Sequence, residues 1–292
     1  MRIAQALQQA QAAGVARLDA QLLLAHLLQR TREWLLAHDD ETLTAHHQSS
    51  FAAGLTRRVA GEPLAYVIGE REFHGLLLQL TPDVLVPRPE TEWLVDWALE
   101  CLALARHGAS TSTVVDLGTG SGAVALAVAA AWPDASIKVT ATDISAAALA
   151  VAQSNAQRLG LRVEFVEGDW WSPLAGRRFH LALGNPPYIA GSDPHLLALQ
   201  HEPRAALTPE GDGLAALRRI ICGAPAHLLP GAWMLLEHGH DQATAVSQLL
   251  AEQGFLSPST RHDLAGLARC TGAAWPGSAL ICTDKSGHCM PF

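Results

Sequence analysis

Hydrophobic positions divide the chain into stretches with different periodicities. Near the start, leucines recur at helical spacing, at Leu18, Leu22, Leu23, Leu27 and Leu28. Thr44 can cap a further helix that runs to Val59. Glycine and proline are sparse until Gly61-Glu62-Pro63, which is typical of a domain boundary. The pattern predicts a small helical domain at residues 1–62.

Residues 63–90 have a different pattern, which favours a β-hairpin linker. Two short apolar runs, 76–80 and 84–86, flank the turn residues Thr81-Pro82-Asp83. The stiff segment 87–92 follows, in which prolines surround Arg88 and Glu90, and a helix is predicted over 91–105. Arg88 and Glu90 either cap that helix as a pair or form a wall of an active site.

From residue 113 to 239 strand and helix patterns alternate, which predicts a doubly wound, mostly parallel α/β sheet within a domain at 91–292. The predicted strands are 113–117, 137–142, 163–166, 179–183 and 232–237, and the predicted helices are 124–131, 145–159 and 214–228. The tail after Trp275 contains Gly, Ser and Pro and is predicted to be loosely held.

Composition and charge narrow the function classes. The chain has 292 residues, is 49% hydrophobic and carries a net charge of −8, which argues against a broad phosphate-binding surface. Its five cysteines form no C-x-x-C pair, its histidines are scattered, and we expect no metal site. The cysteines are typical of a reducing cytoplasm. The first residues lack a signal-peptide pattern, and the longest apolar run is too short to span a bilayer, so a cytoplasmic protein is expected.

A glycine-rich loop follows the first predicted strand of the sheet. Its residues are Asp116, Leu117, Gly118, Thr119, Gly120, Ser121 and Gly122. The G-x-G-x-G spacing differs from the G-x-G-x-x-G of dinucleotide loops, and the carboxylate of Asp116 would repel a pyrophosphate. A carboxylate at this point suits a cationic ligand, such as the ammonium end of S-adenosylmethionine. The loop is therefore a candidate cofactor site.

The next two strands also end in residues suited to this cofactor. Asp143 ends the second strand, where its carboxylate can accept from both ribose hydroxyls. Asp169 and Trp170 follow the third strand, where they can accept from the adenine amino group and pack on the ring. The ends of three consecutive predicted strands thus offer a charge for the ammonium group, an acceptor for the ribose hydroxyls and a ring that stacks on the adenine, in that order along the chain.

The segment Asn185-Pro186-Pro187-Tyr188 follows the apolar strand 179–183 and is a candidate catalytic site. The prolines stiffen the backbone, so Asn185 stands at the edge of the sheet where ligands bind. Its side-chain oxygen and the Pro186 carbonyl are two neighbouring acceptors, which suit an NH₂ group on a planar carbon. An ordinary strand-ending turn is the alternative interpretation.

The chain resembles the peptide chain release factor N5-glutamine methyltransferases, class I S-adenosylmethionine-dependent enzymes. The motifs that carry this resemblance are Gly61-Glu62-Pro63, Arg71-Glu72-Phe73, Pro87-Arg88-Pro89-Glu90-Thr91-Glu92, the glycine loop, Asp143, Asn185-Pro186-Pro187-Tyr188 and Leu235-Leu236-Glu237-His238-Gly239. Three features depart from the family pattern: Gly184 in place of a common serine, the run Asp263-Leu264-Ala265-Gly266, and a longer tail.

The resemblance implies a seven-stranded sheet and methylation of the glutamine in the Gly-Gly-Gln loop of class-1 release factors, in support of translation termination. It implies cofactor contacts from Gly118 to Gly122, Asp143 and Trp170, and a glutamine amide held by Asn185, Pro186 and Tyr188. Pro187, Arg88 and Glu90 complete the expected substrate site, and residues 1–62 are expected to recognise the protein substrate.

Two alternatives remain open at this point, an N6-adenine DNA methyltransferase and a non-catalytic S-adenosylmethionine-binding protein. An adenine amino group has the same shape as an amide, but its enzyme needs a basic DNA-binding surface that the net charge of −8 disfavours. Asn185 and Tyr188 argue against a protein that only binds the cofactor. A glutamine methyltransferase with another protein substrate is a further possibility.

Overall fold

The computed structural model describes residues 1–105, 111–132 and 136–277, and the chain divides into two compact units. Unit 1 consists of Met1–Arg71 and Leu80–Pro82. Unit 2 consists of Glu72–Gln79 and the chain from Asp83 onward. Residues 63–90, which the sequence suggested as a separate linker, are thus shared between the two units.

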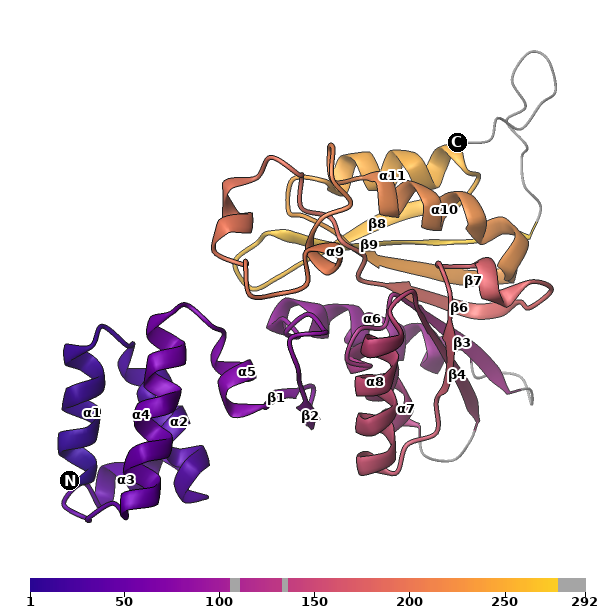
Figure 1. Ribbon diagram of the computed structural model, residues 1–292. Coiled ribbons are helices and arrows are strands. Elements are labelled where there is room, and N and C mark those ends of the chain that lie inside the picture. The colour runs from indigo at the N-terminus through magenta and orange to yellow at the C-terminus, as the bar shows by residue number, and fades with distance from the viewer. Residues whose placement is uncertain (106–110, 133–135, 278–292) are drawn as a thin grey trace. The chain divides into compact units, whose positions relative to one another are not determined.

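Unit 1 is helical, and its elements are α1 (Ile3–Ala12), α2 (Arg17–Leu28), α3 (Arg32–Ala37), α4 (Ala45–Val59) and α5 (Leu64–Ile68) (Figure 1). Thr44 caps α4, as predicted, by accepting a hydrogen bond of 3.1 Å from His47 N. Leu23 and Leu24 of α2 are buried, whereas Leu18 is 49% exposed. The leucine-rich helix therefore turns only one of its faces to the core.

A β-hairpin follows α5, but its turn is not where the sequence placed it. Strands β1 (Glu70–Phe73) and β2 (Leu76–Gln79) pair around His74 and Gly75, whose φ angles are 48° and 77°. Two positive φ angles define the primed turn whose twist suits a tight hairpin. A turn does occur at Pro82 and Asp83, but it joins no strands. The predicted strand at 84–86 and the hairpin around this turn are wrong, because the strand pairing ends at Gln79.

The seven-stranded sheet of unit 2 confirms the predicted α/β class, with strand order β5-β4-β3-β6-β7-β9-β8. Its strands are β3 (Ser112–Leu117), β4 (Ile137–Asp143), β5 (Glu164–Glu167), β6 (Phe179–Gly184), β7 (Leu228–Glu237), β8 (Leu256–His262) and β9 (Ala268–Ala274). Strands β3 to β7 run parallel, and β9 is antiparallel to both β7 and β8. The sheet is therefore mostly parallel, as expected.

Helices cover both faces of this sheet (Figure 1). The helices of unit 2 are α6 (Glu92–Ala105), α7 (Ala123–Ala131), α8 (Ala146–Leu159), α9 (Arg204–Leu207), α10 (Ala215–His227) and α11 (Ala243–Glu252), with short 3-10 turns at Pro89–Thr91, Ser172–Leu174 and Pro194–Leu197. Val114 packs into the cluster that holds α6, α7 and α8, and Val115 into the cluster that holds α10 and α11. Alternate residues of a buried strand thus serve two separate cores.

The order of the strands reverses between β3 and β6, which are neighbours in the sheet although β4 and β5 lie between them in sequence. Leu117, the last residue of β3, pairs with Gly184, the last residue of β6. The glycine loop and Asn185 therefore leave the sheet side by side. A crevice at the carboxyl ends of strands where the order reverses is the usual ligand site of such folds.

Two further features concern the surface and the thiols. No helix among residues 1–105, 111–132 and 136–277 is long and apolar enough to cross a membrane. Cys101, Cys222 and Cys270 are free thiols, of which Cys270 is buried and Cys222 exposed. Cys282, Cys289 and most of the tail after Trp275 lie outside the described residues.

Candidate functional site

A cavity of about 710 Å³ opens at the carboxyl ends of β3, β4 and β6. Its volume lies in the ordinary range for small-molecule sites. The residues predicted from the sequence that line it are Asp116, Gly118, Thr119, Gly120, Ser121, Asp143, Asp169, Trp170, Asn185 and Pro187. The structure thus brings the glycine loop and the two later strand ends to one site with Asn185.

The glycine loop needs glycine for both conformation and space. Gly118, Gly120 and Gly122 have φ angles of 75°, 55° and 85°. A Cβ atom on Gly118 would lie 2.8 Å from a ring carbon of Trp170, and one on Gly122 would lie 2.9 Å from a methyl carbon of Leu126. Any side chain at these two positions would displace the walls of the cavity or the base of α7. Gly122 is the N-cap of α7 and does not line the cavity itself.

Asp116 forms the floor of this loop. It is buried, and its Oδ2 accepts a hydrogen bond of 2.6 Å from the Thr119 hydroxyl. Burial raises the pKa of Asp116 to about 6, against the smaller opposing effect of its hydrogen bonds. Because a cationic group beside it would favour the charged form, the carboxylate suits a ligand with an ammonium group.

Asp143, at the end of β4, is held by the backbone. Its Oδ2 accepts from Gly120 N at 2.9 Å, and its Oδ1 accepts from Ser145 N at 2.9 Å. Burial raises the pKa of Asp143, and these backbone hydrogen bonds oppose the rise. Each carboxylate oxygen keeps a lone pair for a further donor, so the residue can still accept from ligand hydroxyls in the cavity.

Asp169 and Trp170 follow β5 and form the side wall of the cavity. Trp170 has a φ of 49°, and its ring lies against the backbone of Gly118. The carboxylate of Asp169 forms an ion pair with Arg219, which also lines the cavity. Acceptance from an adenine amino group by Asp169 stays a prediction, and Arg219 is a wall residue that the sequence did not indicate.

Asn185 projects into the same cavity from the end of β6. Its Nδ2 donates a hydrogen bond of 3.1 Å to Oγ1 of Thr91, which is 4% exposed. Within the described residues, Oδ1 of Asn185 has no protein partner, so it is available to a ligand. Pro186 is buried, and Pro187 lines the cavity beside Asn185.

Tyr188 does not line the cavity but anchors the loop that carries Asn185. Its hydroxyl donates to Oε1 of Glu237 at 3.3 Å, and its carbonyl accepts from Nε2 of Gln242 at 2.9 Å. Burial, together with the nearby charge of Glu237, raises the pKa of Tyr188, so the hydroxyl keeps its proton. The tyrosine therefore fixes the loop from both its side chain and its backbone.

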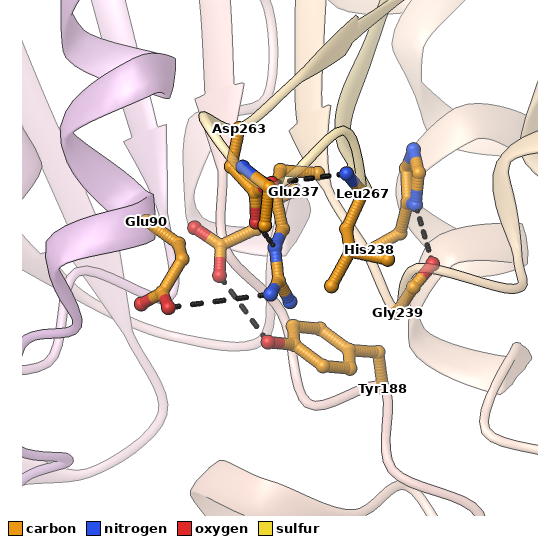
Figure 2. A network of polar contacts seen from close by, with 9 residues as sticks. Glu90, Tyr188, Glu237, His238, Gly239, Asp263 and Leu267 are labelled. Carbon is orange, nitrogen blue, oxygen red and sulfur yellow. Dashed lines mark hydrogen bonds and ion pairs between the residues drawn. The ribbon is translucent and has the colours of Figure 1, made fainter.

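Glu237 lies at the centre of a polar network behind this loop (Figure 2). It is 1% exposed, and its Oε2 has no hydrogen-bond partner in the described part of the chain. Burial raises its pKa to about 7, whereas the nearby hydroxyls of Thr91 and Tyr188 lower it. The figure shows Tyr188 and Glu90 near Glu237, and Glu90 lies 4.0 Å from Nη2 of Arg269.

Arg88 and Glu90 interact with separate partners rather than with each other. Arg88 donates to Glu202 at 2.5 Å, and the buried Glu202 also accepts from Val86 N at 3.1 Å. Glu90 lies 4.0 Å from Arg269. Neither Arg88 nor Glu90 lines the cavity, and their predicted contacts with substrate stay predictions.

The sequence departure at 263–266 forms an ordered turn between β8 and β9. Oδ1 of Asp263 accepts from Ala265 N and Leu267 N, both at 2.9 Å. Its Oδ2 accepts from Nε of Arg269 at 2.8 Å. The turn therefore holds the Arg269 guanidinium group, which also pairs with Glu90; Figure 2 shows Asp263 and Leu267 of this turn.

Several supporting residues were missed by the sequence analysis, namely Thr91, Asn155, Glu202, Arg219 and Gln242. Asn155 on α8 is 0% exposed and donates to the carbonyls of Ser121 and Gln79, each at 3.0 Å. Buried polar side chains are costly unless bonded, so an Asn on the inner face of α8 was a usable signal. Glu202 and Gln242 lie in loops, where no sequence pattern indicated a supporting role.

Comparison with known proteins covers both units. Residues 2–69 match the PrmC N-terminal domain family, and residues 95–236 match the Methyltransferase small domain family. The release factor glutamine methyltransferase of Bordetella pertussis is 52% identical over 262 residues, which are 89% of this chain and 95% of that protein. The protein of the same name from Burkholderia pseudomallei is 47% identical, over 89% and 92% of the two chains.

The chain belongs to the release factor glutamine methyltransferases. Its fold is shared with more distant methyltransferases. The hMettl16 catalytic domain aligns with a TM-score of 0.57 at 14% identity, over 88% of this chain and 91% of that one. A Pyrococcus furiosus methyltransferase aligns with a TM-score of 0.51 at 18% identity, over 80% and 100%.

The cofactor of this methyltransferase is S-adenosylmethionine, and the residues of the cavity fit it. A buried carboxylate, a glycine loop open to close approach, a second carboxylate with free lone pairs and an indole wall match its ammonium, ribose and adenine groups. Asp116, Asp143 and Trp170 would hold these three groups.

Proposed function

We propose that this protein methylates the side-chain amide nitrogen of the glutamine in the Gly-Gly-Gln loop of class-1 peptide chain release factors. S-adenosylmethionine supplies the methyl group, as an electrophilic carbon on a sulfonium. The observation that carries the proposal is the position of Asn185, which lines the cavity together with the glycine loop and whose Oδ1 has no partner among the described residues. The relatives that share both units with this chain support the release factor as substrate.

The chemistry asks the protein to activate a poor nucleophile. The lone pair of an amide nitrogen is delocalised into its carbonyl. Oδ1 of Asn185 and the carbonyl of Pro186 would accept the two N–H groups of the glutamine amide and orient its nitrogen. The same acceptors would stabilise positive charge that grows on nitrogen. The nitrogen gains the methyl group and then releases one proton to water, so no general base is required beforehand.

The surrounding residues would shape the site for a planar amide. Pro187 lines the cavity next to Asn185, and Tyr188 holds the loop from behind. We assign Arg88 and Glu90 to the mouth of the site, because both belong to the segment that carries Thr91. Their ion pairs with Glu202 and Arg269 would keep that segment rigid as a protein substrate approaches.

We assign substrate recognition to the helical domain, residues 1–62. One glutamine side chain cannot distinguish a release factor from other proteins, so a second contact surface is needed to raise the effective concentration at the site. Arginines and acidic residues are nearly balanced in this region, which favours a protein over a phosphate backbone. A location in the cytoplasm, with the translation machinery, is part of this proposal.

The direct test is mass spectrometry of a purified release factor after incubation with the full chain and S-adenosylmethionine. We expect a gain of one methyl group on the Gly-Gly-Gln glutamine, and a gain at least about 100-fold slower with an Asn185→Ala variant. Duplex DNA containing adenine should gain no methyl group under the same conditions. Methylation of DNA, or of a different residue of the release factor, would refute the proposal.

A further inference from the structure

The side-chain amide of Asn185 has two orientations of the same shape, and only one of them serves the proposed function. With Oδ1 toward the cavity, the side chain accepts from a substrate NH₂ group. After a rotation of 180° its own NH₂ group would face the substrate NH₂ group, and two donors would oppose each other. The free energy that separates these orientations must come from the residue on the other side of the amide.

That residue is Thr91, whose Oγ1 lies 3.1 Å from Nδ2 of Asn185. Thr91 is 4% exposed and lies at the end of a 3-10 turn, where its N–H donates to the Arg88 carbonyl at 3.0 Å. The threonine is therefore fixed in position before any ligand binds. Its hydroxyl, however, can either donate or accept, so position alone does not select the orientation of Asn185.

Glu237 supplies the missing direction. It is buried behind the loop, and the Tyr188 hydroxyl donates to its Oε1 at 3.3 Å. Oε1 is an acceptor in both forms of the carboxyl, because the proton of the neutral form can reside on the unpartnered Oε2. Thr91 is the other hydroxyl that interacts with Glu237. If the proton of Thr91 points to Glu237, a lone pair of Oγ1 is left for Asn185, and only the NH₂ side of the amide can donate to it.

We propose that Thr91, oriented by Glu237, is a positioning residue that fixes the Asn185 amide with Oδ1 toward the substrate amide. The role rests on the proposed function. In this arrangement Asn185 contacts the substrate, and Thr91 determines whether Oδ1 or Nδ2 of Asn185 makes that contact. A threonine is better suited than an acid, since a carboxylate at this place would add a charge to the cavity wall.

The test uses the full chain and three variants. Thr91→Val keeps the shape and removes the hydroxyl, Thr91→Ser keeps the hydroxyl, and Thr113→Val removes a hydroxyl at the opposite end of β3, where Thr113 contacts His180. We expect Thr91→Val to lower kcat on the release factor about tenfold or more, with KM and S-adenosylmethionine affinity within about threefold. Thr91→Ser and Thr113→Val should stay within about threefold of the unaltered chain.

A kcat for Thr91→Val within twofold of the unaltered chain would overturn the proposal, and so would an equal loss in Thr91→Ser, which would indicate packing instead. A second readout does not need the substrate. In the NMR spectrum of the full chain, the Nδ2 signals of Asn185, assigned by their loss in Asn185→Ala, should move toward free-amide positions in Thr91→Val and remain in Thr91→Ser. Unmoved signals in Thr91→Val would also overturn the proposal.

The two readouts separate this inference from the function on which it rests. If the unaltered chain does not methylate the release factor, the proposed function fails. The NMR comparison still decides whether Thr91 orients Asn185. If the chain is active and the NMR signals do not respond, the function stands and Thr91 has no orienting role.

Discussion

The two walls of the cavity are built by different means. On the cofactor wall, Asp116 and Asp143 are held by groups near in sequence or by backbone amides of the adjoining loop, such as Gly120 N. On the substrate wall, Asn185 and Tyr188 are held by side chains from distant segments, through hydrogen bonds that span 94 and 49 residues. The cofactor wall is thus a local motif, whereas the substrate wall depends on the assembled fold.

The largest expected effect lies on the substrate wall. Asn185→Ala should lower kcat on the release factor by about 100-fold or more, because orientation and charge stabilisation act mainly in the transition state. Affinity for S-adenosylmethionine, measured by calorimetry, should stay within a few-fold. Near-normal turnover would remove Asn185 from the chemistry, and lost cofactor affinity would show that the two walls are not separate.

The next effect belongs to the cofactor wall. Asp143→Ala should weaken S-adenosylmethionine binding by on the order of 1–3 kcal/mol, because the ligand loses a charged acceptor and Gly120 N loses its partner. Calorimetry measures the affinity, and thermal unfolding confirms that the variant is folded. An unchanged affinity would exclude Asp143 from the ribose site.

A third variant tests whether the glycine loop is as self-contained as its sequence suggests. Asn155→Ala leaves the carbonyls of Ser121 and Gln79 without a buried donor. We expect unfolding in urea to become easier by about 1–3 kcal/mol, with a smaller loss of cofactor affinity. Ser154→Ala, which removes the exposed neighbour that also contacts Gln79, is the matched control and should change little. Equal stability of the two variants would mean that the loop needs no support from α8.

The last effect concerns stability rather than turnover, through pH and the buried acid behind the substrate wall. Burial raises the pKa of Glu237 from an ordinary 4.5 to about 7, in the presence of Tyr188, Arg269, Glu90 and Cys270. A raised pKa in the folded state means that the stability contributed by Glu237 is fully present below pH 4.5 and is lost as pH rises through about 7.

Glu237→Gln removes this titration. Its unfolding free energy, relative to that of the unaltered chain, should therefore rise by about 3 kcal/mol between pH 4.5 and 8. Urea unfolding of both proteins across this range measures the difference. Parallel profiles would show that Glu237 has an ordinary pKa in the folded protein.

The same contrast explains what could be predicted from the sequence. Alternating apolar runs marked five strands of the sheet, and the glycine loop, Asp143 and Asn185 all reached one cavity as expected. The supports of the substrate wall could not be predicted, because Thr91, Glu202 and Gln242 become neighbours of the site only through the folded chain. The hairpin was misplaced because a Pro-Asp pair was taken as the turn, whereas His74 and Gly75 adopt the two positive φ angles.

The pairing of Leu117 with Gly184 has a consequence for how such enzymes diversify. Neighbouring parallel strands lie about 4.8 Å apart. This one residue pair therefore places the glycine loop, which serves the methyl donor, next to the loop of Asn185, which serves the methyl acceptor. Because the pairing of β3 with β6 sets the distance between the two loops, the sequence of either loop can change in evolution while that distance is kept. A different loop after β6 would give an enzyme that methylates a different nitrogen, with the site of the methyl donor unchanged.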